Sequence, residues 1–269
     1  MNNTNSMEIQ PNQGAARAAP VITTEIIMGK VALVTGASRG IGAAIASRLA
    51  KDGFTILVNF ESNISAAEKL VNRIETEGGK AVTAQADISD QQAVSRLFNS
   101  AEVTFGGINT VINNAGIMKL APLAEYEEAD FDRQVAVNLK GTFNVMREAT
   151  ARLQEGGRIV NLSSSVVDLC MPTYSVYAAT KAAVEALTQV VAKELRGRDI
   201  TVNAVAPGPT ATELFLSGKT DEMVGTLAKM SPLERLGRPE DIANTVAFLV
   251  SEQGGWINGQ VIRANGGII

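Results

Sequence analysis

Short apolar runs alternate with longer amphipathic segments from residue 30 almost to the end of the chain. The runs, such as 31–34 (Val-Ala-Leu-Val), are continuous, as in strands buried on both faces. The segments between them, such as 40–51 and 64–77, repeat apolar residues every three or four positions, which predicts helices. This alternation predicts one α/β domain, a doubly wound parallel sheet with helices on both faces.

These patterns predict the residue ranges of the strands and helices. The predicted strands are 31–34, 55–59, 81–85, 109–113, 157–162, 200–205 and 260–263, and the predicted helices are 40–51, 64–77, 90–105, 131–153, 175–197 and a segment after Pro239. A Gly-rich turn at the end of the first strand favours an open doubly wound sheet over a closed barrel.

The first 28 residues differ in composition from the rest. They are rich in Asn, Gln, Thr and Ala, and their apolar pairs are too short for a signal peptide. We therefore predict that residues 1–28 form a mobile N-terminal leader and that the domain spans residues 29–269. A role of the leader in covering a neighbouring subunit is the alternative.

Composition excludes several kinds of chemistry. The chain has no histidine, which removes Ser-His-Asp catalysis, a histidine base and histidine zinc sites, and we predict no metal site. The single cysteine, Cys170, permits no internal disulfide and fits a reducing, cytoplasmic location. A net charge of −4 argues against nucleic-acid binding, and no apolar run is long enough to span a membrane.

The turn after the first strand reads Thr-Gly-Ala-Ser-Arg-Gly-Ile-Gly at 35–42 and opens a helix. Glycines let the backbone turn tightly and approach a pyrophosphate, and the helix N-terminus offers free N–H groups to it. The spacing is GxxxGxG rather than GxGxxG. The turn residues predicted to bind a dinucleotide are Gly36, Ser38, Arg39, Gly40, Ile41 and Gly42.

This turn, Asn-Asn-Ala-Gly at 113–116 and Tyr-Ala-Ala-Thr-Lys at 177–181 together resemble the short-chain dehydrogenase/reductase family. The resemblance covers roughly residues 29–269. It implies a single Rossmann-like domain with a seven-stranded parallel sheet. Because family members are commonly tetramers or dimers, we expect a homotetramer on this resemblance alone.

The end of the second predicted strand bears on the choice of cofactor. An acidic residue there would bind a ribose 2′-OH and repel a 2′-phosphate, whereas here the strand ends in neutral Asn59, followed by Phe60. Arg39 offers a guanidinium for the phosphate and Ser62 a hydroxyl, although Glu61 is a discordant charge. The combination resembles family members that prefer NADPH, so we predict NADP(H) as the cofactor.

The resemblance implies further cofactor contacts. Asp87 with Ile88 corresponds to the place where the family binds the adenine amino group, although a helix cap is the alternative role of Asp87. The remaining positions are Asn114, Ala115 and Gly116 beside the ribose, Tyr177 and Lys181 at the nicotinamide ribose, and Pro207, Gly208, Thr210 and Thr212 at the nicotinamide.

Tyr177 and Lys181 are four residues apart in a predicted helix and so share one face. A unit charge about 4 Å away contributes roughly 4 kcal/mol at an effective dielectric near 20, so Lys181 is expected to lower the pKa of Tyr177 towards neutrality. The resemblance adds Ser164, thirteen residues before Tyr177, as the group that binds a substrate carbonyl, and Asn138 as a member of a proton relay.

The implied reaction is the reversible reduction of a ketone or aldehyde, with a hydride from NADPH and a proton from Tyr177. Apolar residues between Ser164 and Tyr177 and in a predicted lid, 213–236, indicate an apolar small-molecule substrate. A 3-oxoacyl-carrier-protein reductase, with Arg133 and Arg198 docking the carrier, is the first alternative. Sugar, steroid or polyol dehydrogenases and a non-catalytic NADP(H)-binding regulator are the others.

Overall fold

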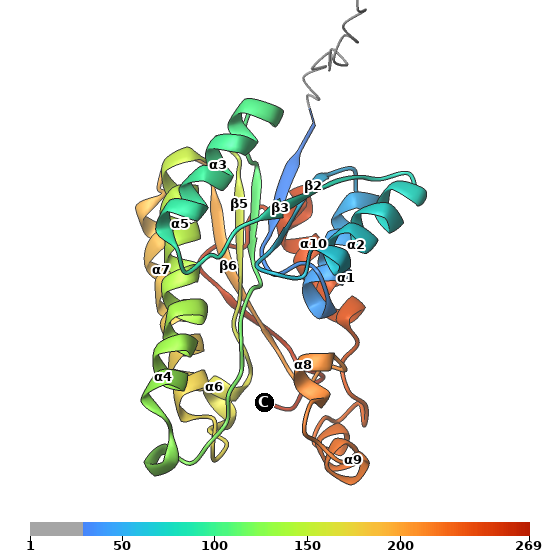
Figure 1. The fold of residues 1–269 in the computed structure, drawn as a ribbon, viewed down its shortest axis with the longest axis vertical. Helices are drawn as coiled ribbons and strands as arrows, with labels where there is room; N and C mark the ends of the chain where they lie inside the picture. The colour runs from blue at the N-terminus through green and yellow to red at the C-terminus, as the bar shows by residue number, and fades with distance from the viewer. Residues whose placement is uncertain (1–28) are drawn as a thin grey trace, which may run out of the picture.

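The structure, a computed structural model, describes residues 29–269, so the predicted leader at 1–28 lies outside the described residues. Seven strands form one parallel sheet in the order β3-β2-β1-β4-β5-β6-β7, which confirms the predicted sheet (Figure 1). The strands are β1 (Val31–Val34), β2 (Thr55–Phe60), β3 (Lys80–Gln85), β4 (Thr110–Asn113), β5 (Arg158–Leu162), β6 (Thr201–Pro207) and β7 (Val261–Ala264).

Helices cover both faces of this sheet, as predicted (Figure 1). On one face lie α1 (Gly40–Lys51), α2 (Ile64–Thr76) and α10 (Pro239–Val250), and on the other lie α3 (Gln91–Phe105), α5 (Thr142–Arg152) and α7 (Ser175–Glu194). Each face has its own apolar core, one centred on Ile45, Ile56 and Ile242, the other on Leu33, Phe98 and Ile159. The strands β1, β2 and β4 are buried along their whole length, which explains their continuous apolar runs.

The predicted helix at 131–153 is longer and less regular than expected. It begins as α4 (Glu128–Val135), passes through a π-helical segment, η2 (Ala136–Gly141), and continues as α5. Apolar residues keep their helical spacing through η2, so the sequence pattern does not reveal that a π-helical turn contains one residue more than an α-helical turn. Asn138 lies in η2, and such π segments are frequent at functional sites.

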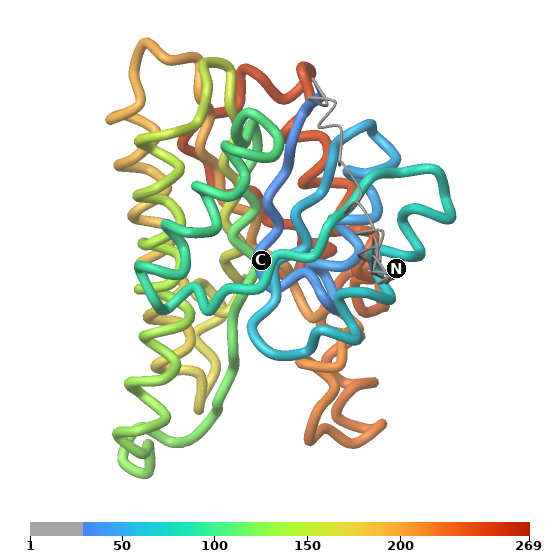
Figure 2. The backbone as a smooth tube through the Cα atoms, turned by 45° about the horizontal axis from the view of Figure 1, so that its top comes forward, coloured from blue at the N-terminus to red at the C-terminus, as the bar shows by residue number. Residues whose placement is uncertain are grey.

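The chain reverses its strand order between β1 and β4, and ligands of doubly wound sheets bind beyond the carboxyl ends of the strands at such a point. Three short helices that the sequence did not predict lie at this end: α6 (Val166–Leu169), α8 (Glu213–Leu216) and α9 (Asp221–Lys229). The last two belong to the predicted lid, which Figure 2 shows as an orange lobe at the lower right. Between residues 29 and 269, no helix has the length and apolar character needed to cross a membrane.

Candidate active site

A cleft of about 620 Å³ opens at the carboxyl ends of the strands. It brings together every site residue predicted from the sequence except Asn138. The predicted residues that line it are Gly36, Ser38, Arg39, Gly40, Ile41, Gly42, Asn59, Phe60, Ser62, Asp87, Ile88, Asn114, Ala115, Gly116, Ser164, Tyr177, Lys181, Pro207, Gly208, Thr210 and Thr212. Residues from six different loops therefore meet in one cavity.

At Gly36 and Gly42 the Gly-rich turn packs too tightly against its neighbours for a side chain. Gly36 has a φ of +59°, and a Cβ there would lie 2.8 Å from the Cα of Ala115. A Cβ on Gly42 would lie 2.4 Å from Nδ2 of Asn114. That amide donates to the carbonyls of Thr35 (2.9 Å) and Gly36 (3.1 Å), so Asn114 fixes the turn.

Thr35 is a structural residue of the site that the sequence reasoning missed. Its buried Oγ1 accepts hydrogen bonds from the backbone N–H groups of Asn114 and Ala115, both at 3.0 Å. This ties the end of β1 to the end of β4. Its position immediately before Gly36 was the available signal, because a hydroxyl there can bond the neighbouring strand.

The turn presents the N-terminus of α1 to the cleft. No side chain caps this end, since the N-cap residue Arg39 makes no capping hydrogen bond and the first turn holds no acidic residue. Uncapped N–H groups at the positive end of a helix dipole suit an anion. The glycine surface, the uncapped helix and the length of the cleft fit a dinucleotide with its pyrophosphate at α1.

Asn59 lines the cleft, but its side-chain amide is bonded to the main chain. It is 1% exposed, its Oδ1 accepts from the N–H of Gly36 (3.3 Å), and its Nδ2 donates to the carbonyls of Ala84 (3.0 Å) and Ala86 (3.1 Å). The amide is thus committed to the main chain and fixes the turn to β2 and β3. The discordant Glu61 is paired with Arg133 at 2.9 Å, which offsets its charge at this rim of the cleft.

Asp87 is not the cap of α3. Asp90 is the cap, since its carboxylate accepts from the N–H of Gln92 at 2.8 Å. The carboxylate of Asp87 accepts from the backbone N–H (2.9 Å) and the hydroxyl (2.8 Å) of Ser89 and lines the cleft. The alternative role as a helix cap is therefore excluded.

The three consecutive serines after β5 have different partners. Ser163 donates to Glu185 at 2.5 Å, and Ser165 donates to the carbonyl of Ala206 at 3.2 Å. Both are buried. Ser164 lies between them and lines the cleft together with Tyr177. Its Oγ accepts from the backbone N–H of Val166 at 3.4 Å, and its hydroxyl partly opposes the rise in the pKa of Tyr177. All three serines line the cleft, but Ser163 and Ser165 donate their hydroxyls to other groups, which leaves Ser164, the serine of the thirteen-residue spacing, as the candidate.

Tyr177 and Lys181 lie one turn apart on α7 and face the cleft. Burial raises the pKa of Tyr177 to about 12, opposed only in part by the Ser164 hydroxyl, and burial lowers the pKa of Lys181 to about 8. The predicted lowering of the pKa of Tyr177 by Lys181 is therefore wrong for this structure. The ammonium is bound elsewhere, since Nζ donates to the carbonyl of Leu162 at 2.7 Å and lies 5.7 Å from the tyrosine ring centroid.

Asn138 lies behind the cleft and is fully buried. Its side chain bonds both backbone groups of Ile117, accepting from the N–H at 2.8 Å and donating to the carbonyl at 2.9 Å. A Cβ on Gly116 would lie 3.3 Å from Oδ1 of Asn138 and 3.7 Å from Nζ of Lys181, so these residues are neighbours. Asn138 therefore holds the loop after β4 beside Lys181.

The far end of the cleft is apolar. Val166, Leu169, Met171 and Tyr174 line it on one side, and Leu214, Phe215 and Leu227 of the lid line it on the other. Leu216, Met223 and Met230, which also belong to the predicted lid, do not line the cleft and are exposed. Cys170 is exposed and does not line the cleft. Residues 29–269 contain no group of three or more His, Cys, Asp or Glu side chains that could hold a metal ion.

Comparisons with known proteins agree with this geometry. A family model described as enoyl-(acyl carrier protein) reductase matches residues 36–269. A short-chain type dehydrogenase/reductase of Picea abies is 45% identical, over 89% of this chain and 92% of that protein. An NADPH-dependent aldehyde reductase-like protein, chloroplastic, of Arabidopsis thaliana is 42% identical, over 90% and 95%. Among solved structures, the angucycline C-6 ketoreductase LanV with bound NADP is 37% identical with a TM-score of 0.83, covering 89% of this chain and 95% of that one.

Proposed function

Because the chain belongs to the short-chain dehydrogenase/reductase family, we propose that this oxidoreductase reversibly reduces a ketone or aldehyde to an alcohol with NADPH. One observation carries the proposal. Tyr177, Ser164 and Lys181 line the same cleft as the uncapped N-terminus of α1. This arrangement supports a proton donor and a carbonyl-binding hydroxyl beside a dinucleotide site.

Ser164, Tyr177 and Lys181 each have a separate role in the proposed carbonyl reduction. When bound, the reduced nicotinamide supplies the hydride that the carbonyl carbon accepts. Ser164 donates a hydrogen bond to the carbonyl oxygen and orients it. Tyr177, protonated at neutral pH because burial raises its pKa to about 12, transfers its proton to that oxygen. The ammonium of Lys181 stabilises the negative charge that develops on Tyr177.

The preference for NADP(H) rests on the rim at the end of β2. Arg39 offers an exposed guanidinium in the Gly-rich turn, and Ser62 lines the same part of the cleft. Glu61 is paired with Arg133, which partly offsets the charge that would oppose a 2′-phosphate. The A. thaliana relative named NADPH-dependent and the solved ketoreductase with bound NADP support the same choice.

The pH dependence of reduction should follow Lys181 rather than Tyr177. Since the pKa of Lys181 is lowered to about 8, its charge is present below that pH and is lost above it, whereas Tyr177 keeps its proton up to about pH 12. We expect kcat/KM to be level below about pH 8 and then to fall about tenfold per pH unit. A profile that rises through pH 8 would show that a neutral Lys181 is the active form.

The proposed substrate is an apolar carbonyl compound, given the apolar end of the cleft. The carrier-protein alternative is weakened because Arg133 pairs with Glu61 and Arg198 bonds the backbone carbonyls of Thr150 and Leu153. Oxidation of NADPH is measured with aldehydes, aryl ketones, α-diketones and a β-ketoacyl thioester. We expect turnover with a ketone or aldehyde, and a preference for the thioester would instead establish the carrier-protein reductase.

We propose that the protein is a cytoplasmic homotetramer. The single cysteine supports the cytoplasmic location, and the family resemblance supports the tetramer. Trp256 is 99% exposed and Phe248 44% exposed near the C-terminal end of the chain. A neighbouring subunit covering them would remove this apolar surface from water. The proposal of a non-catalytic regulator has the least support, since Ser164, Tyr177 and Lys181 line the cleft and Asn138 lies next to Gly116 and Lys181.

A further inference from the structure

An ion pair crosses the mouth of the cleft. Nη1 of Arg39, at the start of α1, lies 2.8 Å from Oε2 of Glu213, the first residue of α8. Both side chains are exposed, by 62% and 76%, and both residues line the cleft. The turn also approaches Thr212, the residue immediately before the lid, because a Cβ on Gly40 would lie 3.5 Å from its Cγ2.

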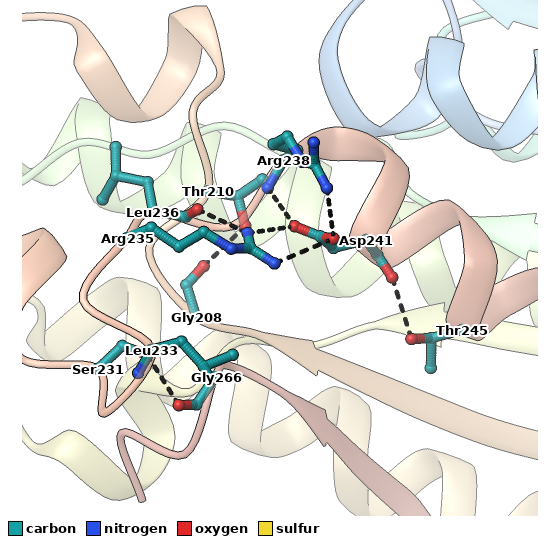
Figure 3. A network of polar contacts seen from close by, with 10 residues as sticks. All are labelled: Gly208, Thr210, Ser231, Leu233, Arg235, Leu236, Arg238, Asp241, Thr245 and Gly266. Atoms are coloured by element: carbon teal, nitrogen blue, oxygen red, sulfur yellow. Dashed lines mark hydrogen bonds and ion pairs between the residues drawn. The ribbon is translucent and has the colours of Figure 1, made fainter.

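The second half of the lid is fixed to the body of the protein (Figure 3). Arg235 bonds the carboxylate of Asp241 at 2.6 Å, and the backbone N–H of Arg238 bonds the same carboxylate at 2.7 Å. The N–H of Gly237 donates to the carbonyl of Pro209 at 2.8 Å. These contacts anchor the lid where it joins α10.

The first half of the lid, residues 213–230, is held much more weakly. Within the described part of the chain, its hydrogen bonds and ion pairs run to its own residues and to the preceding cap residues, with one exception. The exception is the pair between Glu213 and Arg39. A single exposed ion pair thus connects this segment, by polar contacts, to the Gly-rich turn.

We propose that Glu213 is a specificity-determining residue that competes with the 2′-phosphate of NADP(H) for Arg39, and that its displacement loosens the first half of the lid. The inference rests on the proposed function, which assigns that phosphate to Arg39. A carboxylate beside a phosphate dianion is repelled, and the dianion attracts the guanidinium more strongly. The phosphate therefore replaces Glu213 at Arg39.

This exchange links cofactor choice to the lid. NADH has no 2′-phosphate, so it leaves the pair between Arg39 and Glu213 intact. NADPH breaks the pair and frees the segment that carries Leu214, Phe215 and Leu227 into the substrate end of the cleft. Because coupling between two equilibria is reciprocal, removing the carboxylate of Glu213 must tighten NADPH binding.

The binding test compares Glu213→Gln with Glu222→Gln. Glu222 lies on α9 of the same lid and has no ion-pair partner within the described residues, so it controls for the loss of one negative charge. An exposed ion pair is weak, so we expect Glu213→Gln to lower the Kd for NADPH by about two- to fivefold and to leave the Kd for NADH unchanged. An equal effect of both variants, or no effect of either, overturns the proposal.

The lid test uses probes that lack the nicotinamide half. Hydrogen exchange of residues 213–230 is measured with saturating adenosine 2′,5′-bisphosphate and with adenosine 5′-monophosphate. We expect the bisphosphate alone to speed exchange in the wild-type protein. The variant Glu213→Gln should exchange fast without a probe and respond to neither. Unchanged exchange in the wild-type protein with bound bisphosphate would contradict the coupling.

Different results would contradict the two proposals, namely the 2′-phosphate site at Arg39 and the competition by Glu213. If Arg39→Gln abolishes the preference for NADPH while Glu213→Gln changes nothing, the phosphate site is right and the competition is wrong. If Arg39→Gln leaves the preference intact, the phosphate is not bound by Arg39. The competition then has no basis, whatever the activity of the protein.

Discussion

Replacing Tyr177 by phenylalanine is expected to lower kcat for carbonyl reduction by about 10²- to 10⁴-fold, the range that a positioned proton donor contributes. The change removes only the hydroxyl that carries the proton. The phenyl ring can still pack edge to face against Tyr174, as the tyrosine ring does with centroids 6.5 Å apart. Steady-state rates at saturating NADPH give the loss.

A matched control is available at the N-cap of the same helix. Tyr174→Phe makes the same chemical change at a residue that lines the cleft, and we expect it to keep most of the activity because no role in proton transfer is assigned to it. The affinity of Tyr177→Phe for NADPH should stay close to that of the wild type. A variant Tyr177→Phe that retains activity would remove Tyr177 from the proposed chemistry.

Replacing Arg39 by glutamine is expected to change the preference between the two cofactors. Hydrogen bonds between charged groups contribute about 1.5–3 kcal/mol, so we expect kcat/KM for NADPH to fall about 10- to 100-fold. The value for NADH should change little, because NADH lacks the phosphate. The protein should remain folded, since the partner of Arg39 in the structure is the exposed Glu213.

Arg96→Gln is the control for the loss of one positive charge. Arg96 lies on α3, is 66% exposed and is 3.7 Å from Asp90, and it does not line the cleft. It should leave both cofactor constants unchanged. Equal losses of kcat/KM for NADPH in Arg39→Gln and Arg96→Gln would mean that the effect comes from the net charge alone. Equal losses of kcat/KM for NADPH and for NADH in Arg39→Gln would mean that Arg39 does not bind the 2′-phosphate.

The sheet could be predicted because buried strands and helices require recognisable patterns of apolar residues. Strands covered on both faces, such as β1 and β2, need continuous apolar runs, and the long helices need a regular apolar stripe. Helices α6 and α8, with four residues each, are shorter than two turns and show no period. The bounds of the long elements agree with prediction within a few residues, whereas these short helices were missed.

The sequence predicted which residues line the site, but not which atoms their side chains contact. The motifs placed Ser164 and Tyr177 correctly in one cleft, yet sequence spacing says nothing of where a side chain points. The amide of Asn59 turns to the backbone of β3, and the ammonium of Lys181 turns to the carbonyl of Leu162. The pKa of Tyr177 is raised chiefly by burial, and burial is known only once the chain is folded.

The fate of the hydride tests the central claim most directly. Wild-type protein is given a ketone and NADPH deuterated at one of the two C4 positions of the nicotinamide, and the alcohol is analysed by mass and NMR. We expect one of the two labelled cofactors to place a single deuterium on the carbinol carbon, one alcohol per NADPH oxidised. Tight NADPH binding with no deuterium in any product, across aldehydes and ketones, would contradict the proposed reduction and favour a cofactor-binding regulator.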